Sequence, residues 1–178
     1  MQQSDTPEKT TFSAAQYETL MGQIVVNLQA MEFLLRQYLR SKEPISSVSV
    51  LIPDAEQWHI GTSLPICSFT DYDTLEMLIN KYNRQMEASG GMKIDKSLAE
   101  FQDALAHGRV FSTRPLSDEN HPYLVKFSPP KDGSVHVVFR APLSPEWLER
   151  QKSKILESIE NVLSNLSGIF MKGKVDPY

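Results

Sequence analysis

The chain has 178 residues, of which 40% are hydrophobic and 22% are charged, and this length and composition predict one globular domain with a single core. Lys and Arg total 18 while Asp and Glu total 22, which gives a net charge of −4. That balance provides no global basic field and so argues against a protein that coats DNA. It is compatible with a local basic site at a subunit interface.

Three further features of the sequence indicate which sites and which cellular compartment to expect. The single cysteine, Cys67, has no partner for an intramolecular disulfide or for a CxxC zinc site. His121 and His136 lack two further ligands at a suitable spacing, so we expect no metal and no cofactor. Residues 1–12 are polar and are predicted to be a disordered tail rather than a signal peptide. Because no apolar run approaches the ~18–20 residues that span a bilayer, we expect a cytoplasmic protein without membrane contact.

The first predicted element is a long amphipathic helix from Ser13 to about Lys42. Ser13 can cap the first amides, with Gln16 three residues later as in a capping box, and Pro44 stops the helix. A coiled-coil dimer would explain the apolar pattern of this helix, and packing in a helical bundle is the explanation that we favour. The apolar residues recur at spacings of three and four: Tyr17, Met21, Ile24, Leu28, Met31, Leu35 and Tyr38.

Residues 43–70 are predicted to form a long, partly ordered connection to the second helix. They contain three prolines, and connections of this length in compact domains are often functional or packed over a site. Thr70 or Asp71 is expected to cap the second helix. This helix should run to about Ala88, and the Ser-Gly-Gly segment at 89–91 should end it.

A third helix and a β-hairpin follow. Asp95 is expected to open the helix and Gly108 to close it. Residues 123–128 and 134–140 alternate between apolar and polar side chains and are rich in Val and Phe. The Pro-Pro-Lys-Asp-Gly segment between them has the composition of a tight turn, so the sequence predicts a hairpin.

The last predicted helix begins at Ser144 and Pro145, with serine at the N-cap and proline at the first helical position. The fold class that follows is mainly α: an antiparallel bundle of about four helices with one inserted hairpin at about 123–140. Residues 13–170 form the domain, and residues 171–178 are expected to be a frayed tail. The two longest helices lie at the two ends of the domain and are predicted to pack side by side.

The segment FQDALAHGR at 101–109 carries the candidate chemistry. Asp103 and His107 are four residues apart, so they share one face of a helix and can form a hydrogen bond or an ion pair. A histidine in the last turn followed by glycine is also an ordinary helix ending, in which a cation suits the negative end of the dipole and the glycine takes the left-handed conformation. Both interpretations stay open at this point.

The pattern resembles the signature of the HEPN superfamily (higher eukaryotes and prokaryotes nucleotide-binding), in which a late helix ends in Arg-Asn/Asp-x-x-x-His. Asp103 falls on the Asn/Asp position, His107 on the motif histidine and Gln102 on the motif arginine, while Glu32 resembles the acidic residue of the opening helix. The resemblance implies a helical bundle, a homodimer in which two motifs meet, and binding or metal-independent cleavage of RNA. It also suggests a bacterial defence or toxin–antitoxin setting.

Gln102 departs from that signature. Histidine can move a proton at neutral pH, whereas arginine supplies a permanent charge and a two-pronged donor to a phosphate. Losing such a stabiliser costs ~2.7–4 kcal/mol, or about 10²–10³ in rate. Arg109 and Arg114 are the nearest substitutes, although either can also be a solvated loop arginine.

Two hypotheses follow. In the first, the chain is a HEPN-like protein that binds RNA or a nucleotide, with His107, Asp103 and Arg109 as catalytic residues if it is an enzyme and with Gln102 and Arg114 as substrate contacts. In the second, it is a non-catalytic oligomerisation or protein-interaction module.

Three charged residues of the first helix bear on both hypotheses. Glu32 can orient His107 or can pair with Arg36 at i,i+4, and the second is the commoner arrangement. Arg36 and Arg40 are expected on the solvent face of the first helix.

Overall fold

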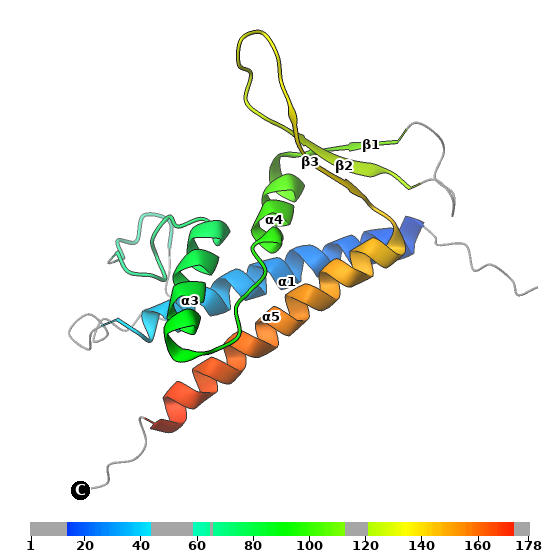
Figure 1. Ribbon diagram of the computed structural model, residues 1–178. Coiled ribbons are helices and arrows are strands. Elements are labelled where there is room, and N and C mark those ends of the chain that lie inside the picture. Colours follow the sequence, from blue (N-terminus) through cyan, green and yellow to red (C-terminus); the bar gives the residue numbers. More distant parts are fainter. Residues whose placement is uncertain (1–13, 44–58, 65, 113–120, 173–178) are drawn as a thin grey trace, which may run out of the picture.

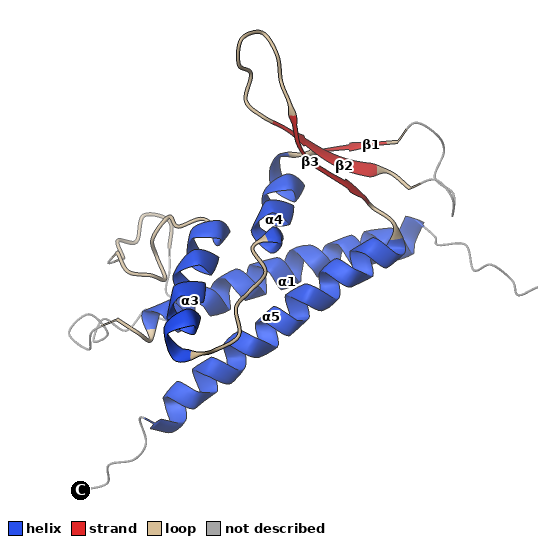
Figure 2. Cartoon of the chain, in the orientation of Figure 1, coloured by secondary structure: helices blue, strands red, loops and turns tan. Residues whose placement is uncertain are grey.

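The computed structural model describes residues 14–43, 59–64, 66–112 and 121–172. Within these residues the fold is mainly helical, with four helices and one three-stranded antiparallel sheet inserted before the last helix (Figures 1 and 2). This confirms the predicted class. The elements are α1 (Ala14–Arg40), α3 (Leu75–Ser89), α4 (Ser97–His107), β1 (Arg109–Phe111), β2 (Tyr123–Phe127), β3 (Val137–Pro142) and α5 (Pro145–Lys172). No helix in the described segments is both long and apolar enough to cross a membrane.

The two long helices, α1 and α5, pack side by side as expected (Figure 1). They run in the same direction, which differs from the antiparallel arrangement expected for the bundle. In the N-terminal halves of the two helices, Lys152 Nζ of α5 donates to Gln23 Oε1 of α1 at 3.5 Å. At the other end, Asn165 Nδ2 of α5 donates to Tyr82 Oη at 2.9 Å, and the Tyr82 ring packs 5.0 Å from that of Tyr38 in α1. The physical reason is that α3, α4 and the sheet return the chain to the end of the molecule where α1 begins.

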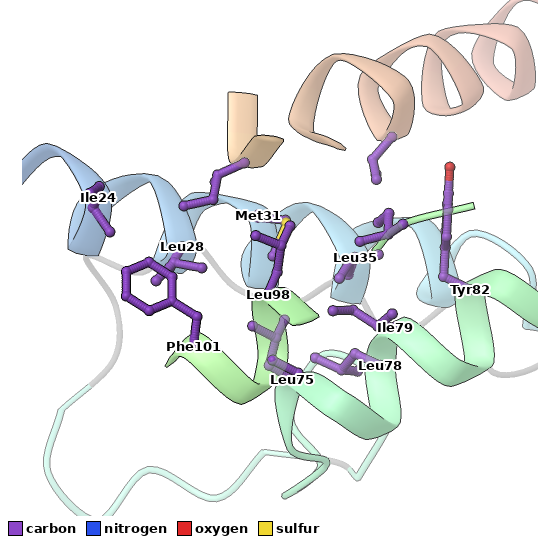
Figure 3. Packing of buried hydrophobic residues seen from close by; sticks show 14 of the residues in the cluster. Ile24, Leu28, Met31, Leu35, Leu75, Leu78, Ile79, Tyr82, Leu98 and Phe101 are labelled. Atoms are coloured by element: carbon purple, nitrogen blue, oxygen red, sulfur yellow. The ribbon is translucent and has the colours of Figure 1, made fainter. Parts of the chain in front are cut away.

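The hydrophobic core lies where α1, α3, α4 and α5 meet. Figure 3 shows apolar side chains of the first three of these helices pointing toward one another. Burying each such side chain contributes about 1.5–3 kcal/mol, so this contact is the main source of stability. Five of the α1 positions predicted from the spacing are buried, at 0–3% exposure: Ile24, Leu28, Met31, Leu35 and Tyr38.

The first turn of α3 is capped differently from the prediction. Thr74, rather than Thr70 or Asp71, is the N-cap, and its hydroxyl accepts from the Met77 amide. Gly90 ends the helix in the left-handed conformation at φ 70°, as the Ser-Gly-Gly segment predicted. The predicted caps were wrong, and the Asp71 carboxylate pairs with Arg36 instead. The predicted N-cap of α1, Ser13, lies outside the described residues.

Arg36 is not on the solvent face of α1, as the sequence suggested, but at a buried junction. Its side chain is 13% exposed and bonds to Glu32 at 3.0 Å and to Asp71 at 2.7 Å. It also donates to the carbonyl oxygens of Ser68 and Asp73. Burial opposes its charge, but the bonds from Glu32 and Asp71 hold the pKa of Arg36 above its ordinary value. Arg36 therefore fastens the segment before α3 to α1, and Arg40, 8% exposed, is likewise buried.

The three-stranded sheet extends the predicted hairpin by one strand. β2 and β3 pair in antiparallel register, and the turn between them uses positive φ values at Asp132 (52°) and Gly133 (76°). The added strand, β1, pairs with β2 through only three residues, too few to show a period. The resulting order is β1-β2-β3.

The two faces of the sheet differ in what they contact. Leu124 and Ala141, which are opposite each other in the register, are buried at 2% and 5% exposure. Lys126 lies on the same side of the sheet as these two residues and bonds to Asp103 of α4. This side is named the inner face. Since side chains alternate along a strand, the neighbours of these residues form the outer face, which includes Arg109, Phe111, Tyr123, Val125, Phe127, Val137, Arg140 and Pro142.

The loop between α3 and α4 is held by the side chain of one buried residue, Asn83. Its Nδ2 donates to the Ile94 carbonyl at 2.8 Å, and its Oδ1 accepts from the Ile94 amide at 2.8 Å. The amide group thus satisfies both polar groups of a buried backbone unit, as a neighbouring strand would. This pairing fixes where α4 starts relative to α3.

Replacing Asn83 with alanine should therefore destabilise the fold by about 1–3 kcal/mol, because the Ile94 amide and carbonyl would lose their partners inside the protein. Urea denaturation followed by circular dichroism measures the change. Arg84→Ala, at the exposed neighbouring position, is the matched control and should change stability by under about 0.5 kcal/mol. Equal effects of the two substitutions would contradict the role assigned to Asn83.

Candidate functional site

The motif residues Asp103 and His107 lie at the exposed C-terminal end of α4. The side chain of His107 is 71% exposed and that of Asp103 is 44% exposed, and His107 Nε2 is 3.9 Å from Asp103 Oδ1. The helical spacing of four places them on one face, as the sequence predicted. This distance is too long for a direct hydrogen bond, so the carboxylate lies near the imidazole but does not fix its orientation. An exposed, unlocked imidazole is accessible to a ligand.

A cation that sequence reasoning missed, Lys126 of β2, is the direct partner of Asp103. The ammonium group of Lys126 forms an ion pair with Asp103 Oδ2, and the lysine side chain is 25% exposed. The alternation of β2 contained the signal, since an apolar, inward Leu124 predicts that Lys126 points to the same side. The partner helix could not be inferred from that alternation. Asp103 is consequently shared between a strand lysine and the motif histidine.

A groove of about 470 Å³ lies beside these residues, between α1, α3 and α4. Four carboxylates line it, and Arg36 compensates only Glu32 directly. A phosphate entering the groove would meet repulsion from the acids of α3 and α4. The groove residues are Glu32, Thr74, Leu75, Glu76, Ala99, Glu100, Gln102, Asp103, Ala106 and His107.

The predicted site residues are only partly brought together. Gln102, Asp103 and His107 all line the groove. Arg109 does not line it, because it begins β1 and its side chain belongs to the outer face of the sheet. Arg114 lies outside the described residues. Within those residues, no arginine lines the groove in the place of the motif arginine.

Glu32 pairs with Arg36, the commoner of the two roles considered for it. The Glu32 Oε1 atom accepts from both Arg36 Nε at 3.2 Å and Arg36 Nη2 at 3.0 Å. Glu32 also borders the groove that His107 borders. Its carboxylate is therefore fixed by its own helix and adds negative charge to the groove wall.

Gly108 ends α4, but for a reason other than the one predicted. Its φ of −80° and ψ of −178° are extended, not left-handed. A Cβ atom at this position would overlap the carbonyl oxygen of Ala104 and would lie 3.0 Å from Leu124 Cδ1 and 3.1 Å from the Val125 carbonyl oxygen. Glycine is required because a Cβ would collide with the Ala104 carbonyl oxygen of α4 itself, and β2 leaves it little room to move away.

Over the residues that the structure describes, no group of three or more His, Cys, Asp or Glu side chains could hold a metal ion. The acids of the groove are distributed over three helices. The chemistry that the site's own residues offer is proton transfer at His107 and ion pairing at Asp103 and Lys126.

Comparisons with protein-family models, with curated proteins and with solved structures find no match to this chain. The resemblance to the HEPN superfamily therefore depends on residues 102–108 and on the helical architecture around them.

Gly108→Ala should lower the free energy of unfolding by about 1–3 kcal/mol, because a methyl group would overlap the Ala104 carbonyl oxygen of α4 and press against β2. Thermal or urea denaturation measures the loss. Gly22→Ala on α1 is the matched control, since a Cβ there meets nothing within 4 Å. That substitution should be neutral or stabilising by up to about 1 kcal/mol, and destabilisation by both would contradict the steric explanation.

Proposed function

We propose that this chain is a HEPN-like protein that binds RNA and whose RNA-cleaving site is weakened by Gln102 at the position of the motif arginine. The observation that carries the proposal is the placement of His107, which is 71% exposed and borders a groove 3.9 Å from Asp103. If His107 served only to end α4, nothing would require it to border a groove. The proposed setting is a bacterial defence or toxin–antitoxin system.

The weakness of the proposed site follows from its electrostatics. Cleavage of RNA builds negative charge on the phosphate, which a permanent cation stabilises. Gln102 contributes at most an uncharged donor, and Lys126 is neutralised by Asp103. Glu76 and Glu100 add repulsion from the groove wall. His107 could still transfer protons, so we expect slow cleavage rather than a change of mechanism.

Incubation with labelled single-stranded RNA, without metal, tests this function. Wild-type protein should cleave slowly and His107→Ala should not cleave. Gln102→Arg should raise the rate, by at most the ~10²–10³ that such a stabiliser is worth. The gain should be larger when Glu100→Gln is added, because removing that carboxylate reduces the repulsion that a phosphate meets in the groove.

Gln85→Arg, which adds the same charge on α3 away from the groove residues, is the control and should leave the rate unchanged. Equal cleavage by Gln102→Arg with and without His107 would remove the catalytic role of that histidine. Absence of RNA binding by the wild type would overturn the function as a whole.

A second function, oligomerisation, is favoured by an apolar hollow next to the groove. This hollow has a volume of about 230 Å³ and lies between α1 and α4. Gln102 and Ala106 line both the hollow and the groove. A homodimer formed through the hollow would place two grooves close together, as the resemblance implies. The hollow is lined by Val25, Leu28, Gln29, Gln102, Leu105 and Ala106.

Val25→Asp should convert a dimer to a monomer, because a carboxylate would be buried at the contact without a partner. Val25 is 42% exposed, so the substitution should leave the monomer folded. Multi-angle light scattering after gel filtration measures the mass. Leu163→Asp on α5, at a position 44% exposed, is the control and should keep the dimer. A wild-type monomer at all concentrations would contradict the prediction.

A further inference from the structure

The outer face of the sheet presents aromatic rings that no helix in the described part of the chain covers. Phe111 and Tyr123 are opposite each other in the register and are 44% and 37% exposed. The rings of Phe111 and Phe127 meet edge to face, with centroids 6.2 Å apart. Val125, which lies between Tyr123 and Phe127 on this face, is only 8% exposed. The aromatic side chains therefore form a continuous layer.

Two arginines lie within the same layer. Arg109 and Arg140 are the register partners of Val125 on its two sides. The Arg140 guanidinium carbon stands 3.9 Å from the centroid of the Tyr123 ring. Among the described residues neither arginine forms an ion pair. With respect to the described residues, each guanidinium can bind an anion without first breaking an ion pair.

The charge of this face is opposite to that of the groove. The groove is lined by Glu32, Glu76, Glu100 and Asp103, whereas the outer face carries only apolar, aromatic and cationic side chains. A polyanion approaching this acidic protein would be repelled by the first and attracted by the second. The sheet lies beyond the end of α4, and its hairpin projects away from the helices (Figure 2).

Exposed rings together with guanidinium groups have the chemistry of a stacking platform. Unpaired bases stack on aromatic side chains, each worth about 1–3 kcal/mol, while arginine neutralises the phosphates. Arginine beside an aromatic ring adds a cation–π contribution. Neither double-stranded nucleic acid, whose bases are already stacked, nor a basic peptide has this complementarity.

We propose that the outer face of the sheet binds single-stranded RNA, with bases stacked on Phe111 and Tyr123 and phosphates held by Arg109 and Arg140. This inference rests on the proposed RNA-binding function and names the surface that carries it. Arg109 follows His107 by two residues, so the platform begins close to the end of α4.

Fluorescence anisotropy with a labelled oligouridine of about 12 nucleotides, within the site size of such platforms, tests the proposal. Phe111→Leu and Tyr123→Leu keep an apolar side chain but remove the ring, and each should weaken binding about tenfold. Arg109→Gln and Arg140→Gln should weaken it and should each lower the salt dependence by about one counterion.

Val110→Ala and Arg84→Gln are the matched controls and should bind like wild type. Val110 is in the same strand as Phe111 but on the opposite side of the sheet, and Arg84 is an exposed arginine of α3. Circular dichroism of every variant establishes that the sheet has kept its fold.

The outcomes separate this inference from the proposed function. Binding by the wild type that the ring and arginine variants leave unchanged would overturn the platform and leave RNA binding elsewhere on the protein. Absence of wild-type binding would overturn both. Equal affinity for a duplex would also overturn the platform, since paired bases cannot stack on it. A loss of self-association in these variants, without a loss of RNA binding, would identify the face as a protein contact instead.

Discussion

The tight junction at Gly108, where α4 ends and the chain enters β1 beside β2, positions His107, Asp103 and Arg109. Next to this junction, Leu124 of β2 enters the core and Lys126 of β2 pairs with Asp103. The same junction directs the chain from His107 immediately into β1 and turns Arg109 to the opposite side of the sheet. The imidazole of His107 therefore borders the groove, whereas the guanidinium of Arg109 lies on the outer face of the sheet.

The molecule consequently keeps its negative and positive surfaces apart. Carboxylates gather in the groove between α1, α3 and α4, where Arg36 is already engaged by Glu32 and Asp71. Arg109 and Arg140, which form no ion pair within the described part of the chain, lie instead on the face that carries the aromatic rings. In a protein with a net charge of −4, local separation of this kind is what allows an anionic ligand to approach one face.

Spacing along the sequence predicted the helices well because apolar period reports which face of an element is buried. It predicted the burial of Ile24 and Leu35, the hairpin, and the common face of Asp103 and His107. It could not predict partners that are distant in sequence, so Arg36 was placed in solvent and Lys126 was overlooked. β1 was missed because three residues show no period, and Gly108 was assigned a left-handed turn because only the packed β2 reveals the steric requirement.

The pairing of α1 with α5 has a consequence for the way the chain acquires its fold. About a hundred residues separate the end of α1 from the start of α5. Contacts between residues this far apart in sequence form late and slow the folding reaction. During synthesis, the apolar stripe of α1 emerges long before the helix that covers it. Until then α3 and α4 can cover only part of that stripe, and a nascent chain in this state is exposed to aggregation.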